Sequence, residues 1–374
     1  MLRHDKDNMA NPTSVGILGM GVFLPETIRL NDHWDAYVEE HQRRAAESIL
    51  RSIETPTAVG EMDPEVAAGL AAYREDPFRG AVRRRVIDPE MGAAEMGARA
   101  AKQALDDAGL SPRDVGLLMV FSDPPDNPIP EDHGRIAELL ELPVNTMSLT
   151  ASAACASYVH QLTVATHLHG RAYEGVALAI QTSAASRVSN PARSGSVVVG
   201  DASVASVIGP VSADLGFIDA TFRTRGNYYR TVQIRPSEDQ GALWYKGGAH
   251  KSDLAYTGPD AAGLAEVGAR AVSLVTEVCE QLLAKAGCTI EDVAFLASPQ
   301  TFPWLPGACA RALGLPEDRT LETFSDYGHC MAAGAPLNLY TAARAGRLSR
   351  GDLVLTYAQG AGFMQGASLL RWGR

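Results

Sequence analysis

An internal repeat constrains the fold of this 374-residue chain more than any other feature of its sequence. The segment ALDDAGLSPRDVGLL at 104–118 resembles LLAKAGCTIEDVAFL at 282–296. A second match, between GRAYEG at 170–175 and GRLSRG at 346–351, lies almost the same distance further along the chain. Two matches in the same order at nearly one offset indicate a duplicated unit rather than chance similarity in an Ala- and Gly-rich chain.

Each copy of the repeat predicts a helix followed by a buried strand. Amphipathic helices are expected over about 90–108 and 260–287, and they end at Gly109 and Gly287, where glycine is a usual helix stop. Alternating helices and apolar strands favour mostly parallel sheets with helices on their faces. We therefore expect an α/β protein made of two duplicated halves that pack as a five-layer αβαβα sandwich.

The halves are predicted to span 1–210 and 211–374. The first half contains a segment, about 31–79, that has no counterpart in the second half. It carries two helical patterns, about 34–53 and 64–74, with charges on their outer positions, and it is interpreted as an inserted helical cap.

Composition excludes several classes of function. The chain has 33 basic and 44 acidic side chains, a net charge of −11 that argues against nucleic acid or an anionic membrane as the main partner. Its five cysteines form no metal-binding spacing and are odd in number, which favours free thiols in a reducing compartment. No apolar run is long enough to span a membrane, so a cytoplasmic location is expected, without a metal or a cofactor.

Two side chains occupy matching places in the two halves. Cys155 follows a strand expected to end near Leu149, and His329 follows a strand expected at about 321–324; each leads into a helix. Repeat symmetry thus predicts equivalent helix openings that can face each other. The positive end of a helix dipole favours thiolate, and an imidazole exchanges protons near neutral pH. The pair indicates a cysteine nucleophile with a histidine partner, although a small buried cysteine with a packing role fits the same pattern.

A glycine-rich run, 358–368, lies near the C-terminus. Glycine lets the backbone approach a ligand closely, so its N–H groups can stabilise an oxyanion. The same run also fits a hairpin between the last two strands, and the two interpretations are compatible.

Together these motifs resemble the thiolase superfamily and, within it, the β-ketoacyl-acyl-carrier-protein synthase III group. The similarity runs from the first strand, at 15–26, to the C-terminus and omits the 31–79 segment. It is strongest at 153–157, 200–202, 327–329 and 360–366.

The resemblance implies a thiolase-like homodimer in which Cys155 takes an acyl group, as a thioester, from acyl-CoA or from the phosphopantetheine of an acyl-carrier protein. It implies an oxyanion hole formed by the backbone of Cys155 and of the loop at Gly362 and Phe363. It also places three consecutive arginines near the phosphates of coenzyme A, where guanidinium suits phosphate, although such a run is equally typical of a solvated face. These arginines are Arg83, Arg84 and Arg85.

Two departures from the family pattern bear on the reaction. Relatives that condense malonyl units carry His-Gln-Ala-Asn after a strand of the second half, where this chain has SPQTF at 298–302; where they have Gly-Asn, it has Gly328-His329. Loss of a donor aimed at an enolate oxygen costs a factor of about 10² to 10³ in rate, so ordinary malonyl condensation is in doubt. Ser298 and Gln300 are expected to contact substrate, and Asp326 to orient His329.

The sequence is therefore compatible with three functions. The first is an acyltransferase of specialised metabolism that passes the acyl group from Cys155 to oxygen or nitrogen of a small-molecule acceptor, with His329 as general base. The second is carbon–carbon bond formation by Claisen condensation on an atypical site. The third is a non-catalytic partner subunit of another synthase, which retention of Cys155 disfavours.

Overall fold

Two β-sheets repeat one topology, which confirms the duplicated α/β fold. The computed structural model describes residues 14–44, 62–236 and 254–374. The sheets have the orders β1-β7-β6-β4-β5 and β11-β12-β13-β8. Pairing is antiparallel from β1 through β7 to β6 and parallel from β6 to β4; the second sheet shows the same sequence of directions from β8 through β13 and β12 to β11.

The first sheet contains β1 (Ser14–Phe23), β4 (Val115–Asp123), β5 (Met147–Thr150), β6 (Val176–Ser183) and β7 (Ala202–Val211). The second contains β8 (Gly216–Thr224), β11 (Val293–Ala297), β12 (Leu353–Gly360) and β13 (Met364–Arg371). Two short ribbons pair β2 (Ile28–Leu30) with β3 (Arg83–Arg85) and β9 (Gln233–Pro236) with β10 (Leu254–Thr257). The expectation of mostly parallel sheets is wrong, because tight turns such as that between β12 and β13 join neighbouring strands and impose antiparallel pairing.

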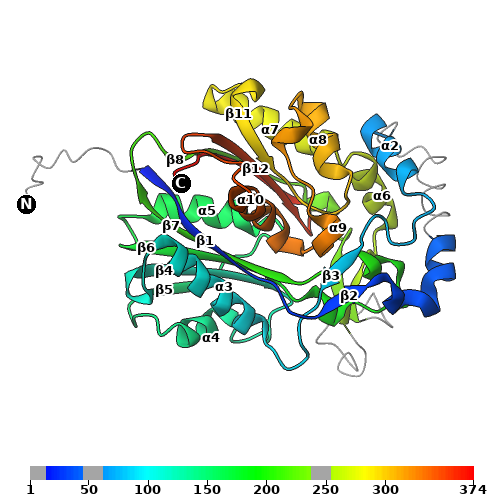
Figure 1. Cartoon of the computed structure of the whole chain (residues 1–374), viewed down its shortest axis with the longest axis horizontal. Coiled ribbons are helices and arrows are strands. Elements are labelled where there is room, and N and C mark those ends of the chain that lie inside the picture. The colour runs from blue at the N-terminus through cyan, green and yellow to red at the C-terminus, as the bar shows by residue number, and fades with distance from the viewer. Residues whose placement is uncertain (1–13, 45–61, 237–253) are drawn as a thin grey trace, which may run out of the picture.

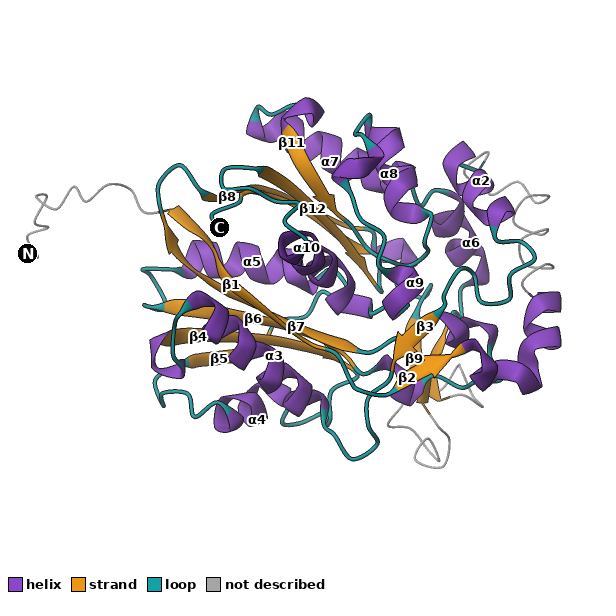
Figure 2. Cartoon of the chain, viewed as in Figure 1, coloured by secondary structure: helices purple, strands orange, loops and turns teal. Residues whose placement is uncertain are grey.

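Helices and sheets alternate in five layers (Figure 1). The helices α3 (Ala93–Ala108) and α4 (Asp132–Leu139) cover the outer face of the first sheet, and α7 (Ser273–Ala286) and α8 (Leu305–Leu313) cover that of the second. Between the sheets lie α5 (Ser157–Leu168) and α10 (Gly334–Arg344), as Figure 2 shows. The observed layers are those of the predicted αβαβα sandwich, and the halves join between the end of β7 and the start of β8.

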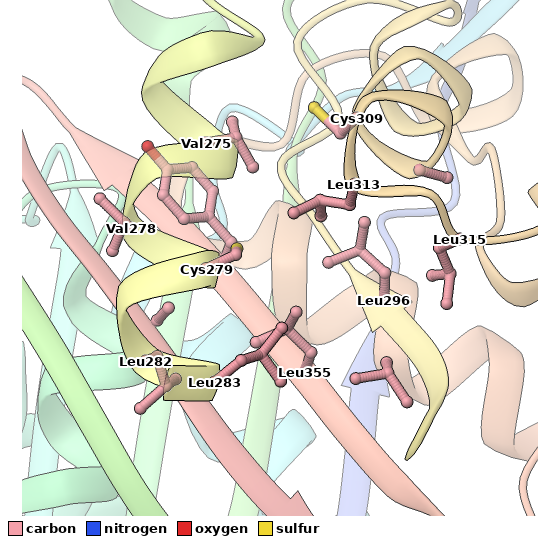
Figure 3. Close-up of a cluster of buried hydrophobic side chains, with 14 of the residues drawn as sticks. Val275, Val278, Cys279, Leu282, Leu283, Leu296, Cys309, Leu313, Leu315 and Leu355 are labelled. Carbon is pink, nitrogen blue, oxygen red and sulfur yellow. The ribbon is translucent and has the colours of Figure 1, made fainter. Parts of the chain in front are cut away.

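The largest apolar cluster fills the outer part of the second half (Figure 3). Val275, Val278 and Leu282 of α7 meet Leu355 of β12 and Leu313 of α8, all nearly inaccessible to solvent. Burial of a Val or Leu side chain contributes about 1.5 to 3 kcal/mol. This packing fixes α7 and α8 on the sheet that carries the glycine-rich hairpin.

Both repeat helices end where the sequence predicts. Gly109 and Gly287 adopt left-handed conformations, with φ of 66° and 67°, which a residue with a Cβ enters only at a cost. The single helix expected over 260–287 is wrong, however, because the chain breaks into α6 (Ala261–Ala269) and α7. Asp63 explains the break: its Oδ2 accepts a hydrogen bond of 2.8 Å from Ser273 N and so caps a new helix start.

The strand expected at 321–324 does not form. Side chains instead take the backbone groups of this segment: Asn338 Nδ2 donates to Leu321 O at 2.6 Å, and Thr323 N donates to Gln300 Oε1 at 3.0 Å. A short helix, α9 (Phe324–Tyr327), follows directly. The second sheet consequently has no equivalent of β5 among the described residues.

The predicted cap is helical where it is described. A 3-10 helix, Asn31–Tyr37, continues as α-helix over 38–44, and the helix expected over about 64–74 is present as α2 (Pro64–Ala72). The remainder of the helix expected over 34–53 lies outside the described residues. A Cβ on Gly69 of α2 would lie 2.2 Å from the Trp304 ring, so glycine lets the cap pack tightly on the second half.

Candidate active site

A cavity of about 430 Å³ lies where the two halves meet, and both Cys155 and His329 line it. Its size is that of a small-molecule site. Most of its lining is apolar and comes from segments far apart in the sequence. The apolar side chains include Val188, Val198, Val232, Val267, Phe302, Leu305 and Phe363.

The Cys155 loop is held against the second half by small residues. Ala153, Ala156 and Val159 form one buried cluster with Ala335 of α10 and Ala358 of β12. Cys155 precedes α5 by two residues. Small side chains allow the two central helices to approach closely, which brings Cys155 toward the loop that carries His329.

Turn geometry fixes the residues around the sulfur. Ser157 Oγ accepts a hydrogen bond from Ala153 N at 2.9 Å and donates to Ala154 O at 2.5 Å. Ala154 adopts a φ of 48°, in the left-handed region that costs a non-glycine residue energy. Strain of this kind is characteristic of positions whose conformation is set by the surrounding structure.

His329 is anchored by the first half although it belongs to the second. Its backbone N donates to Val198 O at 2.6 Å, and its carbonyl accepts from Gly200 N at 3.2 Å. Gly328, with a φ of 69°, makes the turn that presents it. Burial lowers the pKa of the imidazole to about 4, with the backbone of Gln300 acting in the opposite direction. The imidazole is therefore neutral at physiological pH, and its buried Nδ1 has no hydrogen-bond partner among the described residues.

Backbone N–H groups affect the charge state of the Cys155 sulfur. The N–H groups of Cys155 and Ala361 both act on it and favour its anionic form. Phe363 N, by contrast, donates to Gly360 O at 2.9 Å and is not free to bind an oxyanion. Of the expected donors, Phe363 is thus excluded, and Ala361 acts on the sulfur; the Phe363 ring lines the cavity, whereas Gly362 lines a neighbouring hollow.

Gly360 permits this arrangement. A Cβ at this position would lie 2.3 Å from Ala153 O and 2.8 Å from Cys155 N, closer than side-chain carbons pack. The close approach of β12 to the Cys155 loop therefore requires glycine here.

The expectation that a helix dipole activates the Cys155 thiol is corrected by its surroundings. Burial raises the pKa of the Cys155 thiol well above its usual value, and the charge of Asp123 raises it further; these effects outweigh the backbone N–H groups. The thiol is consequently protonated at rest, and formation of the nucleophile requires transfer of its proton to a base.

Asp326 does not orient His329. Its carboxylate forms an ion pair with Arg83 at 2.7 Å, and both side chains are about half exposed. The short helix α9 directs Asp326 to the surface, away from the cavity, because the turn at Gly328 separates the two residues.

Ser298 and Gln300 are buried behind the cavity wall instead of contacting substrate. Gln300 Nε2 donates to Ser298 O at 3.1 Å, and its Oε1 accepts from Thr323 N. Their neighbours Pro299 and Thr301 line the cavity. Successive side chains alternate in direction along this segment, so Pro299 and Thr301 face the cavity whereas Ser298 and Gln300 face away from it.

The three arginines have different surroundings. Arg84 is fully buried, stacks on the Trp34 ring and donates to Val197 O at 2.5 Å, so it is a structural residue and is unavailable to a phosphate. Arg83 is exposed and Arg85 half-buried, which keeps both accessible. Alternation along β3 decides which side chain points inward.

Asp123 and Tyr256 were not singled out by the sequence, yet both line the cavity with Cys155. Burial raises the pKa of the Asp123 carboxyl to about 6. Asp123 ends β4, so the rule that sites form at the carboxyl ends of parallel strands is the signal that could have identified it. Tyr256 belongs to the β9–β10 ribbon, which no sequence motif predicts.

Among the described residues, no cluster of His, Cys, Asp and Glu could hold a metal ion. Nor is any helix within the described ranges long and apolar enough to cross a membrane.

Comparisons with known proteins agree with this architecture. Residues 283–372 match the family model for the C-terminal part of 3-oxoacyl-[acyl-carrier-protein (ACP)] synthase III. The β-ketoacyl-[acyl-carrier-protein] synthase III of Geobacillus kaustophilus is 31% identical over 361 residues, which cover 96% of this chain and 99% of the relative.

Solved structures extend the comparison to the fold. The priming β-ketosynthase of the R1128 polyketide biosynthetic pathway superposes with a TM-score of 0.78 at 21% identity, covering 96% of each chain. Xanthomonas campestris OleA, solved with bound lauric acid and lauroyl-CoA, superposes with a TM-score of 0.72 at 15% identity, covering 96% of this chain and 99% of OleA. With the extended sequence match, the chain belongs to the β-ketoacyl-[acyl-carrier-protein] synthase III family of the thiolase superfamily.

Proposed function

We propose that the chain loads an acyl group from acyl-CoA or an acyl-carrier protein onto Cys155 and transfers it to a second substrate in the same cavity. The observation that carries the proposal is the convergence of Cys155, the Ala361 N–H and a neutral His329 on one largely apolar cavity. Apolar walls suit an acyl chain, and the two N–H groups suit the oxyanion of a tetrahedral intermediate.

The loading step begins with a protonated Cys155 thiol and a neutral His329. His329 accepts the thiol proton as the Cys155 sulfur attacks the thioester carbonyl, and the backbone N–H groups of Cys155 and Ala361 stabilise the oxyanion. The carbon–sulfur bond to the donor breaks, and the imidazolium returns the proton to the departing thiolate. Exposed Arg83 and half-buried Arg85 are the candidates for the donor's phosphates.

Carbon–carbon bond formation is the first candidate for the second step. The relatives are named as β-ketoacyl synthases, which extend an acyl group by Claisen condensation. The structural neighbour OleA was solved with lauroyl-CoA bound, which supports an acyl thioester as the donor.

Acyl transfer to oxygen or nitrogen is the second candidate, and one observation favours it. Pro299 and Thr301 line the cavity where condensing relatives have His-Gln-Ala-Asn, which leaves His329 as the imidazole of the site. One imidazole cannot supply two donors to an enolate, whereas transfer to an alcohol or amine forms no enolate and needs only a base in the cavity. This second candidate is an acyltransferase of specialised metabolism.

Intact-mass analysis tests the loading step. Incubation with acetyl-, octanoyl- and lauroyl-CoA, and with the same chains on an acyl-carrier protein, is expected to add one acyl mass to the peptide that contains Cys155. Cys155→Ala should abolish the adduct, whereas Cys288→Ala, at the other half-buried cysteine of the described residues, should leave it unchanged. Failure of every donor to acylate Cys155 contradicts the proposal.

Malonyl thioester separates the two candidates. Release of CO₂ and a β-ketoacyl product from the loaded enzyme would support decarboxylative condensation. Formation of an ester or amide with a panel of alcohols and amines, without CO₂ release, would support the second candidate.

A further inference from the structure

Two parallel strands deliver Asp123 and Cys155 to the same edge of the first sheet. β4 and β5 pair in parallel, with Val120 opposite Thr150, and Ala151 N donates to Val120 O just beyond the last pair. Asp123 is the last residue of β4, and Cys155 follows β5 by five residues. The carboxyl ends of parallel strands meet at one edge, so both side chains enter one cavity, which they line together with His329.

The Asp123 carboxyl is not held in an ion pair with any described residue, so it can accept a proton. The ion pairs found among the described residues do not include it, unlike the nearby Asp126, which pairs with Arg187 at 3.0 Å. Its backbone carbonyl accepts from Ala184 N, which fixes the end of β4 beside β6. The side chain thus sits at the end of β4, in the cavity that Cys155 also lines, rather than on the exposed loop that follows.

We propose that Asp123 is the general base of the second half-reaction, which removes a proton from the acceptor that attacks the acyl group on Cys155. The inference rests on the proposed function and assigns a base to the second half-reaction, in a site where Pro299 stands in place of the histidine of condensing relatives. It also restricts the acceptor to one with a removable proton on the attacking atom.

Four titratable or charged groups share the cavity with Asp123: Cys155, Tyr256, His329 and Arg193. The Tyr256 hydroxyl favours the ionised carboxyl, and the buried Asp201 acts in turn on Tyr256. Against these, burial raises the pKa of Asp123 to about 6, near the value that suits a base at neutral pH. The carboxyl is therefore mostly ionised at pH 7 and strongly basic for an aspartate.

The proposed step balances without another reactant. The Asp123 carboxylate takes the proton of the acceptor, and the acceptor atom forms a bond to the acyl carbon. The bond between that carbon and the Cys155 sulfur then breaks, and the proton passes from the Asp123 carboxylic acid to the thiolate. The thiol and the carboxylate are both regenerated for the next loading step.

Breakdown of the isolated acyl-enzyme tests the step with water as the acceptor. The enzyme is loaded with octanoyl-CoA, freed of excess donor, and followed by intact mass from pH 5 to 8. The wild-type rate is expected to rise with pH through a midpoint near 6. Asp123→Asn should still take the octanoyl group onto Cys155, but its acyl-enzyme should break down about 10² to 10⁴ times more slowly and lose the pH dependence.

Matched variants separate catalysis from structure. Tyr256→Phe removes a group that lowers the pKa of Asp123, so it should move the midpoint to higher pH. Glu131→Gln removes a carboxylate in the loop after β4 that does not line the cavity, and it should behave as wild type. A wild-type rate and midpoint in Asp123→Asn would overturn the assignment.

Alkylation of Cys155 tests the placement of Asp123 without any acyl donor. Because the Asp123 charge raises the pKa of the thiol, Asp123→Asn should shift the pH profile of iodoacetamide labelling at Cys155 to lower pH. An unchanged labelling profile contradicts the proposed role. A shifted profile combined with no acylation by any donor would instead refute the proposed function and leave Asp123 correctly placed beside the sulfur.

Discussion

At the scale of single residues, the neutral imidazole of His329 should set the pH range of the proposed loading step. Because burial lowers the pKa of His329 to about 4, its basic form persists as pH falls, and the rate declines only when pH approaches that value. An ordinary histidine, with a pKa of about 6.5, would already be protonated at pH 5. We expect the rate of Cys155 acylation in Asp123→Asn, in which the carboxyl that acts on the thiol is removed, to be nearly constant from about pH 8 to 5 when measured by rapid quench and intact mass. A midpoint near 6.5 contradicts this prediction.

Gly360 controls the spacing of the two backbone donors. Gly360→Ala places a Cβ against Ala153 O and Cys155 N, and this contact should push β12 away from the Cys155 loop. Loss of one oxyanion donor reduces the rate about 10² to 10³-fold, and we expect acylation to slow by this order. Gly134→Ala, on α4 with open space around its Cβ, is the control. Equal acylation rates in the two variants would show that Gly360 has no such role.

At the scale of elements, Asp63 explains why the helix expected over 260–287 is two helices. Its carboxylate accepts from Ser273 N and satisfies one free donor at the start of α7. Asp63→Ala should lower the free energy of unfolding by about 1 kcal/mol, while Asp63→Asn keeps an acceptor and loses less. Urea denaturation followed by circular dichroism measures both. Equal stability of the alanine variant and wild type would exclude the capping role.

Features that depend on nearby residues in the sequence were predictable, whereas features that depend on contacts with distant segments of the chain were not. Gly109 and Gly287 stop their helices through backbone preferences that sequence alone reveals. The strand expected at 321–324 failed because Asn338 and Gln300, which belong to other segments of the chain, take its backbone groups. Phe363 was misassigned as a donor for a different reason: its N–H is consumed inside the hairpin turn, which leaves the neighbouring Ala361 to face the sulfur.

At the scale of the whole molecule, the cavity exists only because the duplicated halves pack against each other. Repeat symmetry in the sequence led to Cys155 and His329, since each lies shortly before the central helix of its half, α5 or α10. Symmetry could not identify Asp123 or Tyr256, because the repeat position that matches Asp123 carries Thr301, which is not an acid or base, and Tyr256 reaches the cavity through packing of the β9–β10 ribbon. The proposed reactive centre thus combines the pair that the repeat predicts, Cys155 and His329, with two residues that it does not, and specificity toward an acceptor can arise at Asp123 and Tyr256.

The edge of the first sheet bears on assembly. β5 is a terminal strand, and exposed apolar side chains lie on or near it: Ile129, Val144 and Met147. An uncovered apolar edge promotes association, and a second copy related by a twofold axis can pair with it strand to strand. We expect light scattering to give twice the 39.7 kDa mass of one chain. Val144→Asp combined with Met147→Asp should yield monomer, whereas Ile218→Asp, at an exposed site on β8, should not. A monomeric wild-type protein, or a double variant that stays dimeric, would show that this edge is not the interface.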